Sequence, residues 1–124
     1  MSAFDPKRTV ASTLNPYGAG MRPPHSPDLI ADITLVPGLG RGRSSGWRPN
    51  HDFGLLHYND AHIEFADGAV QPGETGRAEL WLLAPELQVG RLSEGFAFTL
   101  HEASRLVARG VLVKVLREDL LAEN

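Results

Sequence analysis

Several features that assign a chain to a common protein class are missing from this sequence of 124 residues. It contains no cysteine, so disulfides and thiolate metal sites are excluded, and a cytoplasmic location is the default expectation. No apolar run approaches the roughly 20 residues that cross a bilayer, which predicts no association with a membrane. Residues 1–8 have no apolar stretch behind their charges, so we expect no signal peptide.

The sequence also has little that indicates catalysis or nucleotide binding. A phosphate-binding loop of the G-x-x-x-x-G-K-[ST] type is missing, so we expect no GTP binding. His101, Glu102 and Ser104 supply the residue types of a hydrolase triad, but adjacent strand residues point to opposite faces and do not form a relay. We therefore expect a protein without catalytic residues and without a cofactor.

Positive charge is scarce as well. The formal net charge is −3 at pH 7, with 12 Lys and Arg against 15 Asp and Glu. Because neutralising phosphates supplies most of the non-specific affinity for nucleic acid, this balance argues against a dedicated nucleic-acid binder. A local basic patch is still compatible with it.

What the chain does contain is enough apolar sequence for one domain, with 42% hydrophobic and 22% charged residues. Residues 1–26 are rich in proline and glycine and show no periodicity, so we expect a flexible or extended N-terminal tail there. We expect residues 27–117 to form the β-domain. Residues 118–124 are expected to be a short, charged C-terminal tail.

Within residues 27–117, short aliphatic and β-branched runs alternate with turn signals. The runs expected to form strands cover residues 28–36, 51–57, 61–65, 77–83, 96–101 and 107–115. The pairs Asp67-Gly68 and Pro72-Gly73 are turn signals, because glycine accepts the positive φ that such turns require. About six strands at short spacing, without a long helix, predict an all-β protein that is either a closed barrel or a sandwich.

For the run at residues 107–115, the spacing of the valines predicts which face of the strand they occupy. Val107, Val111, Val113 and Val115 are expected to share one face of their strand. Gly110 interrupts the run, and a glycine within a strand often marks a bulge or a close crossing of two chains.

Five segments of the chain occur together in the order typical of one known family of barrels. VQPGE at residues 70–74 is similar to a V/M-x-P-G-D/E turn, and GFAFTLHE at 95–102 is similar to G-L-R-F-A-I-R-E. The other three segments are GWRPN at 46–50, AELWLLAP at 78–85 and RLVARGVLVKVL at 105–116. In this combination the chain resembles the C-terminal barrel domain of elongation factor Tu. The resemblance implies a six-stranded antiparallel barrel that works by docking.

Two segments that contact tRNA in that family differ here. GRGRSS at residues 40–45 replaces a longer loop that carries an Arg-His pair, and HEASR at 101–105 replaces an R-E-G-G-R turn. The second change removes two glycines, and with them the backbone freedom that a close approach to a phosphate uses. The resemblance thus implies the barrel more directly than it implies tRNA binding.

The loop from residue 38 to residue 49 holds the first candidate binding site. Arg41, Arg43 and Arg48 lie beside Trp47 in the sequence, and guanidiniums next to an indole suit a phosphate, a base or another arginine. The alternative is a solvated loop in which Trp47 packs on the edge of the barrel and Arg48 pairs with a surface acid. Both interpretations stay open at this stage.

Histidines and carboxylates are concentrated on one expected hairpin. The group consists of His51, Asp52, His57, Asp60, His62 and Glu64. Imidazole and carboxylate ligands suit zinc, but their spacing matches no established zinc pattern. Because polar residues at alternate positions also describe a solvated sheet face, we expect no metal site here.

Trp81 lies between Leu80 and Leu82 and is expected to face outward from the barrel. An exposed tryptophan beside Leu83 would suit an interface with a partner. The alternative is that the N-terminal tail folds back over it.

These observations together predict a non-catalytic binding module that docks to a protein partner, with a link to translation implied by the resemblance. The residues expected to contact a partner are Arg41, Arg43, Trp47, Arg48, Trp81, His101 and Arg105. The alternative function is binding of structured, tRNA-like RNA through the arginine-rich loop at residues 40–49. That alternative predicts strongly salt-sensitive binding.

Overall fold

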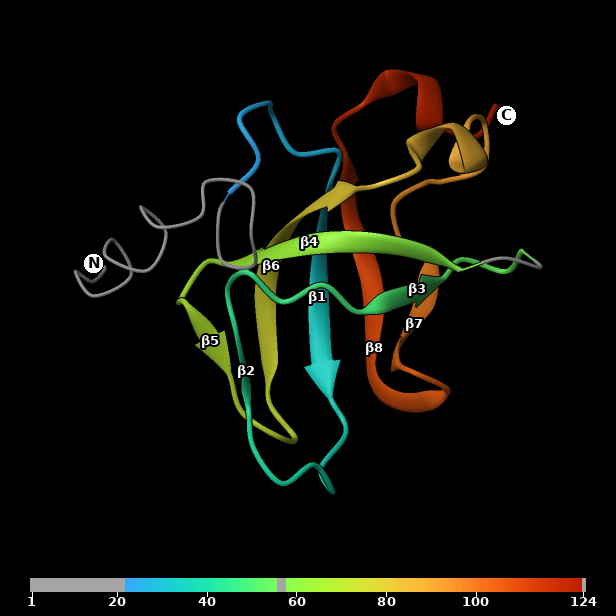
Figure 1. Cartoon of the computed structure of the whole chain (residues 1–124). Helices are drawn as coiled ribbons and strands as arrows, with labels where there is room; N and C mark the ends of the chain where they lie inside the picture. Colours follow the sequence, from blue (N-terminus) through green and yellow to red (C-terminus); the bar gives the residue numbers. More distant parts are fainter. Residues whose placement is uncertain (1–21, 56–57, 124) are drawn as a thin grey trace.

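The computed structural model describes residues 22–55 and 58–123, which form a small all-β fold (Figure 1). The six strands of the main sheet are β1 (Leu29–Leu35), β3 (Asn50–Asp52), β4 (Asn59–Phe65), β6 (Thr75–Leu82), β7 (Ala97–Glu102) and β8 (Arg105–Val115). Two short strands, β2 (Arg43–Ser44) and β5 (Ala69–Val70), pair with each other. Two 3₁₀ turns, η1 (Pro85–Gln88) and η2 (Glu118–Leu120), complete the described elements. No helix in these ranges is long and apolar enough to cross a membrane.

The main sheet closes on itself. Its strand order is β1-β6-β4-β3-β7-β8, and β1 pairs antiparallel with both β6 and β8. All the other neighbours are antiparallel too. The expected all-β, six-stranded antiparallel barrel is therefore confirmed, and the sandwich alternative is wrong.

The two expected glycine turns flank β5. Gly68 and Gly73 have φ values of 84° and 83°, in the left-handed region that favours glycine. Because β5 pairs with β2, these turns attach the loop between β1 and β3 to the outside of the barrel. The loop that carries the predicted arginine site is therefore anchored at its centre.

The valines of β8 do not share one face. Val107 and Val115 are buried, whereas Val111 is 46% exposed. Register shifts leave Val107 without a direct partner in β7 and Val113 without one in β1. The expectation was wrong because these two irregularities, rather than one interruption at Gly110, change the alternation of the strand.

Gly110 instead marks a close crossing inside the barrel. It lies directly opposite Phe98 in the pairing of β7 with β8. A Cβ atom at position 110 would meet the ring of Phe98 well inside van der Waals contact. The aromatic ring thus fills the space that a side chain would otherwise occupy, which favours glycine at this position.

His51 lies among aromatic rings in the barrel interior. Its ring stacks on Phe53 and Phe98, with centroids 5.8 and 5.7 Å away, and its Nδ1 donates to the carbonyl oxygen of Pro49 at 3.0 Å. The side chain is fully buried, and burial lowers the pKa of His51 from 6.5 to about 4, because the charged imidazolium would lose its hydration. His51 is therefore neutral at physiological pH.

The turns η1 and η2 adjoin at one end of the barrel, beside the C-terminus of the described chain (Figure 1). The backbone N–H of Gly90 donates to Asp119 at 3.0 Å, and that of Leu92 donates to Leu120 at 2.9 Å. Leu92 and Leu120 are fully buried. These contacts fix residues 118–122 of the expected C-terminal tail against the barrel.

The crossing at Gly110 gives the first prediction. Gly110→Ala should lower the free energy of unfolding by about 1–3 kcal/mol, because the new methyl group overpacks against Phe98. Gly40→Ala is the matched control, since a Cβ atom there has no neighbour within 4 Å. Urea unfolding of both variants measures the difference, and equal free energies of unfolding would contradict the close crossing.

His51 gives a pH-dependent prediction. The unfolded chain takes up a proton at His51 near pH 6.5, whereas the folded protein takes it up only near pH 4. Stability should therefore fall as the pH drops from about 6.5 to about 4, by roughly 3 kcal/mol from this group. His51→Gln should remove this share of the pH dependence in urea unfolding at several pH values; an unchanged slope would show that His51 does not cause it.

Candidate functional site

Glu102, at the end of β7, is the centre of a cluster that includes the arginine loop. Its carboxylate accepts hydrogen bonds from Arg43 Nε and Nη2, both at 2.8 Å, and from Trp47 Nε1, also at 2.8 Å. The remaining guanidinium nitrogen of Arg43 donates to the carbonyl oxygens of Arg41 and Gly42. All three guanidinium nitrogens of Arg43 are therefore engaged within the chain.

The charges of this cluster support each other. The hydrogen bond from Arg43 is the main reason that the pKa of Glu102 is lowered, and the hydrogen bond from Trp47 acts in the same direction. The pKa of Arg43 is raised, chiefly by its hydrogen bond to Glu102. A charged, bidentate pair of this kind is among the stronger hydrogen-bonded contacts in proteins. We conclude that Arg43 holds the loop in place rather than offering a free guanidinium to a ligand.

The predicted binding residues of the loop are only partly brought together. Arg105 lies directly opposite Glu102 in the pairing of β7 with β8, and the backbone carbonyl of Arg41 contacts the guanidinium of Arg43. Trp47 stacks on Phe65 at the barrel edge, with ring centroids 6.3 Å apart, as one of the two interpretations expected. Arg48 forms no ion pair with another described residue, so the surface acid expected for it is not found there.

His101 lies apart from this cluster. Its Nε2 is 2.8 Å from Thr99 Oγ1, and its ring stacks on Tyr58 with centroids 5.0 Å apart. Because His101 and Arg48 both have surroundings different from those of Arg43, the seven predicted contact residues do not form one surface. The missing information was the strand register, which decides which side chains lie opposite one another.

Trp81 faces outward but is only 2% exposed. Its Nε1 donates to the carbonyl oxygen of His25 at 2.6 Å, and the guanidinium carbon of Arg22 lies 5.3 Å from its ring centroid. The rings of Trp81 and His62 also meet in a T-shaped arrangement, with their centroids 5.7 Å apart. Residues 22–25 of the expected tail thus cover Trp81, while residues 1–21 lie outside the described part of the chain. Arg48 lines a small hollow of about 270 Å³ beside this tryptophan.

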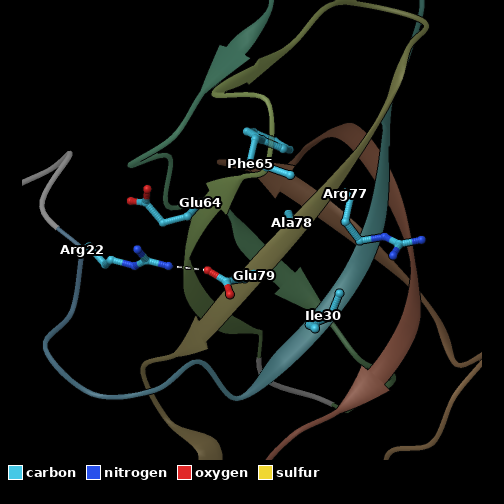
Figure 2. Close-up of a pocket in the computed structure, with 8 residues that line it drawn as sticks. Arg22, Ile30, Glu64, Phe65, Arg77, Ala78 and Glu79 are labelled. Atoms are coloured by element: carbon cyan, nitrogen blue, oxygen red, sulfur yellow. Dashed lines mark hydrogen bonds and ion pairs between the residues drawn. The ribbon is translucent and has the colours of Figure 1, made fainter. Parts of the chain in front are cut away.

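A larger hollow of about 430 Å³ lies on the outer face of β4, β6 and β1 (Figure 2). The residues that line it are Arg22, Ile30, Glu64, Phe65, Ala66, Arg77, Ala78 and Glu79. Arg22 reaches Glu79 from one side, with Nη2 2.5 Å from Oε1, while Arg77 turns the other way and pairs with Asp32 on β1. We call this site the acidic hollow, after Glu64 and Glu79.

The histidines and carboxylates considered for metal binding are dispersed. His51 points into the barrel core, Asp60 accepts a hydrogen bond from Asn50, and His57 lies outside the described residues. His62 and Glu64 do meet on the outer face, with Nε2 2.6 Å from Oε2. Among the residues that the structure describes, no group of three or more such side chains is placed to hold a metal ion.

Sequence reasoning missed an apolar surface at the end of the barrel that carries η1 and η2. Its members are exposed aliphatic residues on these turns and on the adjoining strand ends: Leu83, Leu87, Val89, Leu116 and Leu121, with exposed fractions from 38% to 56%. We call this surface the apolar end; the turns that carry it lie beside the C-terminus of the described chain in Figure 1. Strand alternation does not identify it, because these residues lie outside regular strands.

No protein-family model matches the chain, and no curated protein matches it at a significant level. The resemblance to the barrel of elongation factor Tu therefore stays a prediction from the sequence segments given above. Conclusions about function rest on the geometry of the surfaces just described.

The anchoring role of Glu102 is testable. Glu102→Ala should lower the free energy of unfolding by about 1–3 kcal/mol, because Arg43 and Trp47 lose a shared, partly buried acceptor. Glu94→Ala, which removes an exposed carboxylate of the same charge, should change it by less than about 0.5 kcal/mol. Urea unfolding followed by circular dichroism measures both variants, and equal effects would show that Glu102 does not anchor the loop.

Proposed function

We propose that this chain is a non-catalytic binding module that docks to a protein partner through the apolar end. The observation that carries this proposal is the gathering of Leu83, Leu87, Val89, Leu116 and Leu121 at one end of the barrel. Single exposed aliphatic residues are ordinary on protein surfaces, but several at one end indicate a contact surface. Covering them with a partner would remove apolar area from water.

Charged residues with an excess of acids lie on the turns that carry this surface. Glu86 lies in η1, and Glu118 and Asp119 begin η2, all of them exposed, while Arg117 before η2 pairs with Asp119. Apolar surface with a charged rim is the usual arrangement of a protein interface, and an acidic rim favours a partner with basic residues around its own apolar contact. The resemblance to a barrel that works by docking supports the same proposal, and favours a partner from the cytoplasmic translation machinery.

RNA binding through the loop at residues 40–49 has less support. The guanidinium of Arg43 is bound by Glu102 and lies over Trp47, whereas Arg48 lines the small hollow together with Trp81. A phosphate clamp needs several free cationic groups on one face. The loop leaves its guanidiniums divided between separate sites, so we keep protein docking as the proposed function.

The proposal predicts that binding depends on the apolar end. Leu87→Ser combined with Val89→Ser should abolish recovery of a specific partner protein from lysate, because both side chains are exposed members of this surface. Val111→Ser is the matched control, since Val111 is 46% exposed but lies in the middle of β8. Quantitative affinity capture with the unchanged chain and both variants measures the effect.

The expected pattern is one partner recovered equally by the unchanged chain and by Val111→Ser, and lost with the double variant. Circular dichroism confirms that the double variant keeps its β-fold before its loss of binding is interpreted. A partner recovered equally by all three proteins, or no partner above background, would contradict docking through the apolar end.

A further inference from the structure

The acidic hollow places two carboxylates opposite each other on the outside of the barrel. Glu64 on β4 and Glu79 on β6 are direct partners in the strand register, so their side chains leave the same face of the sheet. Like charges directly opposite each other on neighbouring strands are unfavourable. The arrangement is stabilised by positive charge placed between or beside them.

Arg22 supplies such a charge from within the chain. Its Nη2 lies 2.5 Å from Glu79 Oε1, and its guanidinium carbon lies 5.3 Å from the ring centroid of Trp81 (Figure 2). An ion pair together with contact to an aromatic face is a recurrent mode of guanidinium recognition. Arg22 therefore shows how this face of the barrel holds an arginine side chain.

The hold on Arg22 is weak. Its side chain is 61% exposed and that of Glu79 is 39% exposed, and solvent screens an ion pair of this kind. Glu64 is left to pair with His62 rather than with Arg22. The hollow thus keeps a second carboxylate and unfilled space beside the guanidinium that occupies it.

The rest of the hollow suits the stem of an arginine. Ile30 and Ala66 supply apolar side chains on the outer face, whereas Phe65 and Ala78 belong to the buried core beneath the hollow. Arg77 also lines the hollow, but its guanidinium is paired with Asp32. The methylene groups of arginine pack on apolar surface while the charged head stays at its edge. Neither lysine nor a metal ion would use the aromatic face of Trp81 as a planar guanidinium does.

An independent feature lies next to the hollow. His62 is 1% exposed, its Nε2 is 2.6 Å from Glu64, and its Nδ1 is buried without a hydrogen-bond partner among the described residues. A buried polar atom left unpaired is unusual in a folded protein and leaves His62 Nδ1 able to donate a hydrogen bond to an added group or to accept one from it. His62 also lines the small hollow beside Trp81, which continues the same face of the barrel toward Arg48.

We propose that the acidic hollow binds an arginine side chain in an extended, basic segment of another protein, and that Arg22 occupies the site until that segment displaces it. The small hollow beside Trp81 provides room for a residue next to the bound arginine, and Leu83 of the apolar end lines it. None of the residues that line the acidic hollow itself belongs to the apolar end. The proposal therefore does not depend on docking through the apolar end.

The test uses the full chain and a short, capped peptide with two arginines separated by alanine, followed by NMR titration of the backbone and indole N–H signals. Arg22→Ala should raise the apparent affinity for this peptide by roughly three- to tenfold, because the site no longer has an internal occupant. The shifted signals should be those of Glu64, Glu79 and Trp81. Arg109→Ala, an exposed arginine on β8, removes the same charge elsewhere and should leave the affinity nearly unchanged.

Three further measurements decide between explanations. Glu79→Gln in the Arg22→Ala background should remove binding while the spectrum keeps the dispersion of the folded barrel. A lysine version of the peptide should bind more weakly, and magnesium or calcium alone should not compete. The proposal is overturned if Arg22→Ala binds no arginine peptide at millimolar concentration, if Glu79→Gln binds as well, or if lysine or a divalent cation binds equally.

Discussion

The pairing of β1 with both β6 and β8 is the constraint on which the rest of this structure depends. An open sheet leaves two rows of unpaired N–H and C=O groups at its edges, and closing the barrel removes both. Because every strand is then held from two sides, its outward side chains keep a defined register. In the register of β4 with β6, which are joined by residues 66–74, Glu64 faces Glu79 and His62 faces Trp81.

Closure also separates the side chains into two groups. Those inside the barrel stabilise the fold, and those outside are available for binding. The interior is filled by aliphatic and aromatic side chains, and even its histidine, His51, is neutral and stacked between rings. On the outside, Glu102 binds Arg43 and Trp47 and so attaches the arginine loop to β7. The guanidinium of Arg43 is therefore not free to bind a ligand. Two surfaces of different character are left: the aliphatic residues of the apolar end and the carboxylates of the acidic hollow.

Sequence patterns predicted much of the fold and little of the site. Turn signals such as Pro72-Gly73 and the alternation around Phe98 depend on nearest-neighbour geometry, so they identified these turns and this strand correctly. The strand expected at residues 51–57 is wrong beyond Asp52, because β3 covers only Asn50–Asp52 and residues 53–55 leave the sheet. The faces of β8 were wrong because bulges depend on the partner strands, which local sequence does not specify. The arginine loop was predicted as one site, but Glu102, far along the chain, engages Arg43, and Arg48 points to a different part of the barrel.

The sequence by itself determined the class of the protein, the number of strands in its main sheet and two of the turns between them, because these follow from side-chain alternation and from the backbone preferences of proline and glycine. Only the tertiary structure decided which charged groups neutralise each other and which stay available. Charge pairing acts over a few ångströms in space, and the residues that form these pairs are 59 positions apart for Arg43 and Glu102 and 57 apart for Arg22 and Glu79. Folding brings these distant residues together, and a local sequence pattern does not predict which of them meet.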